Sequence, residues 1–151
     1  MNAALKSELR QAVRDGIARA LAVVGLAAVA LIHLLDLPDT IRETPYLGAL
    51  YLALMAGCGV LAAALVHSSA SSAWRAAAGL SASVFAGYVL SRTTGLPGAG
   101  DDVGNWTEPL GMASLFVEGA VVALASAVLV GRRPARLAAG SKVLRTLRAA
   151  A

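Results

Sequence analysis

Long apolar stretches with almost no charge alternate with short polar segments along this chain. A helix needs about 20 mainly apolar residues to cross the hydrocarbon of a bilayer, and about 17 suffice when the flanking residues help. Four stretches reach that length once their boundary residues are included. The pattern therefore predicts four membrane-spanning helices, with approximate bounds 18–36, 46–67, 74–92 and 109–131.

The two ends of the chain carry a second pattern, in which leucines recur at helical spacing beside basic residues. Residues 3–17 place Leu5, Leu9 and Val13 at four-residue steps next to lysine and arginine. Such a pattern is typical of an amphipathic helix that lies on the membrane surface. Pro134 is expected to end the fourth span, and residues 135–148 repeat the basic, leucine-containing pattern. The predicted fold is all-α: a four-helix transmembrane bundle with short amphipathic surface helices at both ends.

Composition supports a membrane protein. Hydrophobic residues make up 58% of the chain and charged residues 15%, whereas an ordinary soluble domain has about 25% charged residues. Too few polar faces remain for four such helices to meet water. We therefore expect residues 1–151 to form a single integral membrane domain, which leaves no room for a separate catalytic domain.

The basic residues are distributed unevenly about the predicted spans. All but two of the 13 lysines and arginines precede the first span, lie between the second and third, or follow the fourth. Short loops rich in lysine and arginine stay in the cytoplasm. The chain is therefore expected in a plasma (inner) membrane with both termini cytoplasmic, and with lipid rather than nucleic acid as its partner. Most acidic residues fall on the outer side, as do the exceptions Arg42 and Arg92.

Glycine and proline are dense in the longer outer segment, residues 92–108, where they specify turns. Apolar residues within it can fold it back on the bundle, so we expect an ordered cap. Small residues recur every fourth position at Gly79, Ser83 and Gly87, and again from Gly119. Such stripes let helix backbones approach in lipid. They leave open whether the contacts form within one chain, in a homo-oligomer or in a larger membrane complex.

Glu118 is the first candidate for chemistry. It lies nine residues into the fourth span, about 13 Å below the outer boundary at 1.5 Å per residue. A carboxylate at such a depth costs about 2.5–3.5 kcal/mol on insertion scales. The mostly small residues on its helical face suggest that it points into the bundle. Glu118 is thus a candidate proton or cation acceptor, and a structural acid bonded to a neighbouring helix is the alternative.

Two pairs at the outer ends of the spans come next. His33 and Asp36 are three residues apart and share one face of the first helix. Asp36 can orient the imidazole, and an outer histidine can titrate near neutral pH. Tyr88 and Arg92 share a face of the third helix. We expect Arg92 to pair with an outer acid, and we assign Glu118, His33, Arg92 and Tyr88 to a candidate ion or proton site.

The outer acids also define a candidate metal site. Carboxylates supply the hard oxygen donors that calcium and magnesium prefer, while a histidine favours zinc or a similar metal. No spacing in the sequence matches an established metal-binding signature, so solvated loop carboxylates are the alternative. The cofactor is left open, with a divalent metal ion as the candidate. The predicted ligands are His33, Asp36, Asp101, Asp102 and Glu108.

Several segments carry a resemblance. The runs LSRTTGLPG at 90–98 and DDVGNWTEPLG at 101–111, with HLLDLP at 33–38 and ETPYLG at 43–48, resemble small four-span proteins of actinobacterial membranes. The resemblance covers about residues 20–131. It implies a bacterial inner-membrane setting and carries no activity, substrate or site residue.

The leading functional interpretation is a non-enzymatic polytopic membrane protein with an outward-facing polar site that binds or conducts a cation or protons. The alternative is an accessory subunit that docks on a larger membrane complex through its glycine-rich faces. A metal-dependent membrane enzyme ranks third, because only one intramembrane histidine, His33, is available and His67 borders the inner loop.

Overall fold

The computed structural model describes the backbone of residues 2–149 and the side chains of residues 2–132. The described chain is all-α and contains no strand. It consists of four long helices and one turn of 3-10 helix (η1). Their bounds are α1 Ala3–Glu43, α2 Pro45–His67, α3 Ser71–Thr93, η1 Gly100–Asp102 and α4 Pro109–Ala149. The predicted all-α bundle is confirmed.

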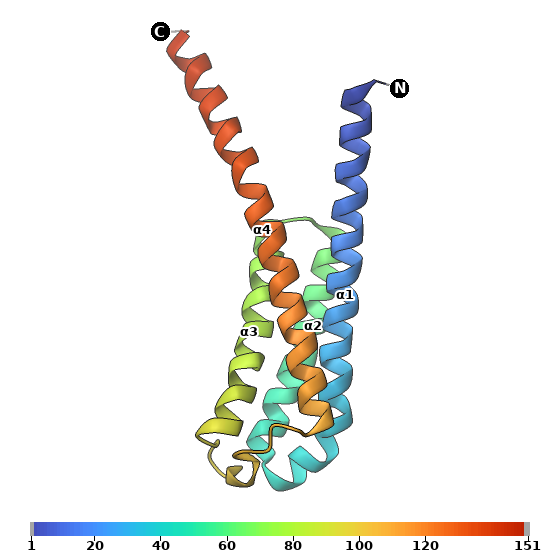
Figure 1. Cartoon of the computed structure of the whole chain (residues 1–151), viewed down its shortest axis with the longest axis vertical. Coiled ribbons are helices and arrows are strands. Elements are labelled where there is room, and N and C mark those ends of the chain that lie inside the picture. The colour runs from blue at the N-terminus through green and yellow to red at the C-terminus, as the bar shows by residue number, and fades with distance from the viewer. Residues whose placement is uncertain (1, 150–151) are drawn as a thin grey trace.

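The helices run alongside one another in an elongated bundle, with both chain ends projecting from the same end of it (Figure 1). The opposite end carries the α1–α2 turn at Thr44 and the segment 94–108, and we call it the cap end. Three helical segments within the described residues are long and apolar enough to cross a membrane: α1, α2 and residues 109–132 of α4. The protein is therefore membrane-embedded. Helix α3 has the same 23-residue length as α2 but carries serines at positions 81, 83 and 91.

The terminal segments differ from the prediction. Residues 3–17 do not form a separate surface helix; they are the first turns of α1, which runs without a break from Ala3 to Glu43. The prediction that Pro134 ends the fourth helix is wrong, since α4 continues to Ala149. A proline removes one backbone donor but can be accommodated within a bent helix. Figure 1 shows both ends as extensions of the bundle helices.

The first outer connection is shorter than predicted. Helix α1 passes through Pro38 and ends at Glu43, so that Thr44 alone separates it from α2. The absence of a side chain at Gly48 lets the last turns of α1 pack on α2, because a Cβ there would collide with Ile41. This close packing offsets the backbone hydrogen bond lost at Pro38.

The core lies between α1, α2 and α4 and continues along the α3–α4 contact. Its largest fully buried side chains include Leu26, Leu65 and Trp74. Helices α2 and α3 are the exception, because they pack against each other far less than α1 packs on α2. A Cβ at Gly79 or Gly87 would meet no atom within 4 Å, so the predicted α3 stripe does not draw another helix of the described chain close.

Candidate functional site

A cavity of about 710 Å³ opens at the cap end, among all four helices and the 94–108 segment. Its polar wall residues come from both halves of the chain. Its apolar wall residues occur near the cap end as well as deeper, where Leu54, Leu80 and Val84 line it. The polar members include His33, Asp36, Thr40, Tyr51, Tyr88, Ser91, Arg92, Asp102, Glu108 and Ser114, and the apolar members include Ile32, Leu50, Leu54, Leu80 and Val84.

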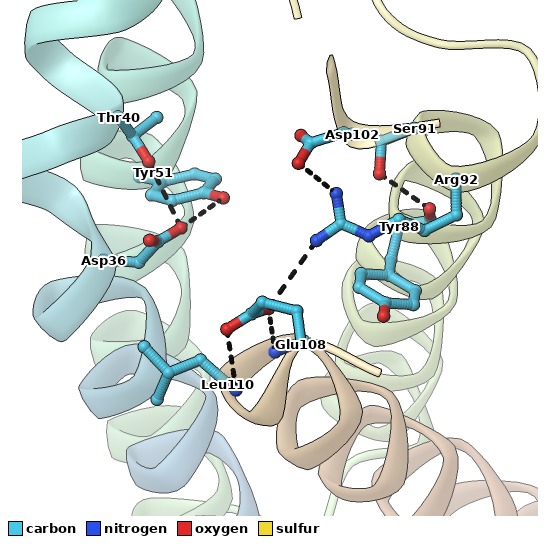
Figure 2. A network of polar contacts seen from close by, with 10 residues as sticks. Asp36, Thr40, Tyr51, Tyr88, Ser91, Arg92, Asp102, Glu108 and Leu110 are labelled. Carbon is cyan, nitrogen blue, oxygen red and sulfur yellow. Dashed lines mark hydrogen bonds and ion pairs between the residues drawn. The ribbon is translucent and has the colours of Figure 1, made fainter. Parts of the chain in front are cut away.

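Asp36 is the central polar residue of the wall formed by α1 and α2. Its Oδ2 accepts a hydrogen bond from Tyr51 Oη at 3.1 Å and another from Thr40 Oγ1 at 3.2 Å. Figure 2 shows these three side chains together on one side of the network. Within the part of the chain whose side chains are described, no lysine or arginine forms an ion pair with Asp36. The carboxylate is thus held by neutral hydroxyls and keeps its charge uncompensated.

His33 lies one turn deeper on the same wall and is 6% exposed. Its Nδ1 is 2.9 Å from the carbonyl oxygen of Val29. Because a carbonyl can only accept, Nδ1 carries the hydrogen, and Nε2 is the nitrogen left for other partners. The ring packs edge-on against Tyr51, with centroids 4.6 Å apart. The α1–α2 wall thus places an imidazole and a carboxylate on either side of one tyrosine.

Arg92 organises the opposite wall, formed by α3, the 94–108 segment and the start of α4. It is only 7% exposed. Its guanidinium pairs with Asp102 and lies 3.6 Å from Glu108, and it stacks 4.8 Å from the centroid of the Tyr88 ring. Figure 2 shows this group facing the Asp36 group across the network. The positive charge of Arg92 is therefore already compensated by two carboxylates.

Glu108 has a structural role that the sequence analysis missed. Its carboxylate accepts hydrogen bonds from the backbone N–H groups of Leu110, at 2.9 Å, and Gly111, at 2.6 Å. These are first-turn donors of α4 that would otherwise lack partners, and a negative charge is favourable at a helix N-terminus. The sequence could have indicated this capping role, because an acidic residue directly before a proline such as Pro109 is typical of a helix start.

The cavity carries an excess of negative charge. Five carboxylates line it, those of Asp36, Asp39, Glu43, Asp102 and Glu108, against the single guanidinium of Arg92. Asp39 pairs with Arg42 at 3.3 Å, and both side chains are well exposed. A cleft lined mainly by one sign of charge attracts ions of the opposite sign.

The predicted metal ligands are not gathered into one site. Among the side chains that the structure describes, no three or more histidine, cysteine or acidic groups lie together in a way that could hold a metal ion. Asp101 does not line the cavity. The carboxylates of Asp102 and Glu108 are engaged by Arg92 and by the α4 N-terminus. Asp102 and Glu108 thus have ion-pair and helix-capping partners within the structure.

Glu118 does not line the cavity but lies beneath it, one turn further along α4 from the wall residue Ser114. It is fully buried, and its Oε1 accepts a 2.5 Å hydrogen bond from Ser114 Oγ. Among the described residues, its Oε2 has no hydrogen-bond partner. Of the predicted ion or proton site, His33, Arg92 and Tyr88 thus line one cavity, and Glu118 connects to it through Ser114.

The arrangement can hold a positively charged group near Asp36 and an apolar body against the deeper leucines. Its volume lies within the roughly 300–1,000 Å³ usual for small-molecule sites. Thr40, Tyr51 and Ser114 were not among the predicted site residues. Ser114 could have been found from its i, i+4 relation to Glu118.

Comparison with protein-family models, with curated proteins and with solved structures found no match to this chain.

Proposed function

We propose that this protein is a polytopic membrane protein that binds a monovalent cation in the cap-end cavity. The observation that carries the proposal is the state of Asp36: a partly buried carboxylate, oriented by two hydroxyls, without a cationic partner among the described side chains. A charge in such surroundings is costly unless it is paired. A bound cation would supply the missing partner.

The membrane setting in this proposal is a bacterial inner membrane crossed by all four helices, with the cap end outside. Support comes from Arg19, Arg75 and Arg132, which lie near the α2–α3 connection at the end opposite the cap, in accordance with the positive-inside rule. The length of α3 and its contact with α4 support a fourth span. The cavity would then face outward.

A monovalent cation fits better than a divalent metal. Calcium takes 6–8 oxygen ligands and magnesium demands near-octahedral geometry. Asp36 with the hydroxyls of Tyr51 and Thr40 offers a single negative charge and few donors. That charge balances one positive charge.

Glu118 is the proton-accepting member of the proposed site. Its free Oε2 and its bond to the cavity residue Ser114 support this role. Replacement by glutamine keeps the shape and removes the ionisable group. In proteoliposomes, Glu118→Gln is expected to abolish any pH dependence of cation binding or flux, and an unchanged pH profile would remove Glu118 from the proposal.

The direct test is equilibrium binding to the purified protein in nanodiscs, with empty nanodiscs as the blank. The probes are ammonium, tetraethylammonium and tetraphenylphosphonium. We expect at least one to bind, and Asp36→Asn to weaken that binding by at least about tenfold, or 1.4 kcal/mol. Asp101→Asn removes the same charge from a residue outside the cavity and is expected to leave binding unchanged. Absence of binding by all three probes, or equal binding by Asp36→Asn, would contradict the proposal.

A second candidate function is that of an accessory subunit in a larger membrane complex. It is favoured by the open face of α3, where Gly79 is exposed and no atom of the described chain lies near its missing side chain. Small residues on such a face permit close helix contact. Gly79→Leu is then expected to abolish co-purification with a fixed partner from mild detergent. Recovery of the wild-type protein alone would count against this function.

A further inference from the structure

The cavity is much larger than a small inorganic cation requires. Its volume of about 710 Å³ is that of a site for an organic molecule. Leu54, Leu80 and Val84 line its deeper part, further from the cap end than Asp36 and Tyr51. A carboxylate near one end and apolar walls at the other complement a molecule with both a positive charge and a hydrophobic body.

The cavity also reaches the side of the bundle, between α2 and α3. Leu50 on α2 is 58% exposed, Ser83 on α3 is exposed, and both line the cavity. Ser83 lies ten residues before the end of α3 at Thr93, which corresponds to a depth of about 15 Å at 1.5 Å per residue. An opening at this depth faces lipid when the bundle is embedded in a bilayer.

The weak packing between α2 and α3 explains why this side stays open. The close approach of these helices comes deeper, where a Cβ on Gly57 would lie 3.3 Å from Leu80 Cδ2. Nearer the cap end, the missing side chain of Gly87 leaves open space, and Gly87 lines the cavity. The opening is therefore a slot bounded by Leu50 on α2 and by Ser83 and Gly87 on α3, with the Gly57–Leu80 contact below it.

We infer that the ligand of this cavity is a lipophilic organic cation that reaches Asp36 from the bilayer through the slot between α2 and α3. The inference rests on the proposed cation site and specifies its substrate class and its route of access. The charge of the ligand pairs with the Asp36 carboxylate, while its apolar body replaces lipid contacts with contacts to Leu54, Leu80 and Val84. A small hydrophilic cation would leave those apolar walls unfilled.

Two glycines of α3 provide a matched pair of variants. Neither Gly87 nor Gly79 has an atom within 4 Å of the position where a Cβ would stand, so both accept a Cβ without collision. Gly87 lines the cavity and Gly79 does not. Gly87→Leu therefore places a branched side chain in the slot, whereas Gly79→Leu makes the same change on the outside of the same helix.

The experiment measures binding of three probes to the full-length protein in nanodiscs by calorimetry. The probes are tetraphenylphosphonium, tetramethylammonium and the lipophilic anion tetraphenylborate. We expect tetraphenylphosphonium to bind at least about tenfold more tightly than tetramethylammonium, because it buries far more apolar surface. Tetraphenylborate is expected not to bind. Gly87→Leu should lower the affinity for tetraphenylphosphonium or its association rate at least about tenfold, and Gly79→Leu should match the wild type.

The outcomes separate the inference from the proposed function. Equal, Asp36-dependent affinity for the small and the large cation would overturn the inference and leave the cation site in place. Equal binding of tetraphenylborate would show an apolar slot without charge selection and would overturn both. Wild-type binding by Gly87→Leu, with helix content and monodispersity unchanged, would overturn the route between α2 and α3.

Discussion

The two walls of the cap-end cavity hold carboxylates in opposite states. On the α3–α4 wall, Asp102 and Glu108 face the buried guanidinium of Arg92, and Glu108 also caps α4. On the α1–α2 wall, the partners of Asp36 among the described side chains are the hydroxyls of Tyr51 and Thr40. The carboxylates of the first wall have a cationic partner, whereas Asp36 on the second wall has none among the described side chains.

This difference separates structural acids from an available one. A carboxylate that is paired and bonded to a helix end has little to gain from a ligand. A partly buried carboxylate that is bonded to neutral hydroxyls gains a charge partner when a cation binds. We therefore expect substitutions in the α3–α4 wall to affect stability most, and substitutions in the α1–α2 wall to affect the proposed binding most.

The largest effect on stability is expected from Gly111→Ala. Gly111 lets α4 begin directly against the Tyr88 ring, and a Cβ would collide with that ring and lie 2.6 Å from Glu108 Oε2. Forcing these groups apart should cost about 1–3 kcal/mol, seen as a lower unfolding temperature in detergent. Gly119→Ala is the control, because its Cβ would meet Phe85 at an ordinary 3.8 Å. Equal stability of the two variants would contradict the close contact at Gly111.

Arg92→Gln is expected to lower the free energy of unfolding by about 2 kcal/mol. It leaves Asp102 and Glu108 without their cation and removes the stacking on Tyr88. Both carboxylates retain some exposure to solvent, which limits the loss. Thermal unfolding measures the change, and limited proteolysis between residues 94 and 108 reports on the cap. Unaltered unfolding and cleavage would mean that Arg92 does not hold this wall together.

Tyr51→Phe tests the other wall with a smaller change. It removes the hydroxyl that donates to Asp36 and keeps the ring that packs on His33. The loss of one hydrogen bond to a charged group should lower the free energy of unfolding by about 1.5 kcal/mol or less, because the carboxylate has partial access to solvent. We expect cation binding to weaken, with no loss of stability beyond this amount. The opposite pattern, lost stability with full binding, would assign Tyr51 to structure.

Much of the fold could be predicted from the sequence, and the site only in part. The apolar runs located the helices because bilayer thickness fixes their length. Pro134 misled because a proline is typical of a helix end, whereas α4 continues past it to Ala149. His33, Asp36, Tyr88 and Arg92 were found as polar groups at the helix ends.

The partners of those residues could not be predicted. Asp102 and Glu108 were read as metal ligands, since composition alone does not reveal that Arg92 and the start of α4 engage them. Tyr51, on α2, became visible as a partner of Asp36 only when the helices were placed side by side. Thr40 lies four residues after Asp36 on α1 and was missed because the first span was expected to end at residue 36. The spacing of residues in the sequence shows which side chains share one face of a helix. Which faces of two helices meet is determined by the three-dimensional packing.

One paired measurement tests the division between the two walls most directly: calorimetric titration of tetraphenylphosphonium into Asp36→Asn and Arg92→Gln under identical conditions. We expect Asp36→Asn to lose at least about tenfold in affinity. Arg92→Gln should bind at least as tightly as the wild type, because it removes a positive charge from a cavity that attracts cations. Full binding by Asp36→Asn together with lost binding by Arg92→Gln would contradict this division.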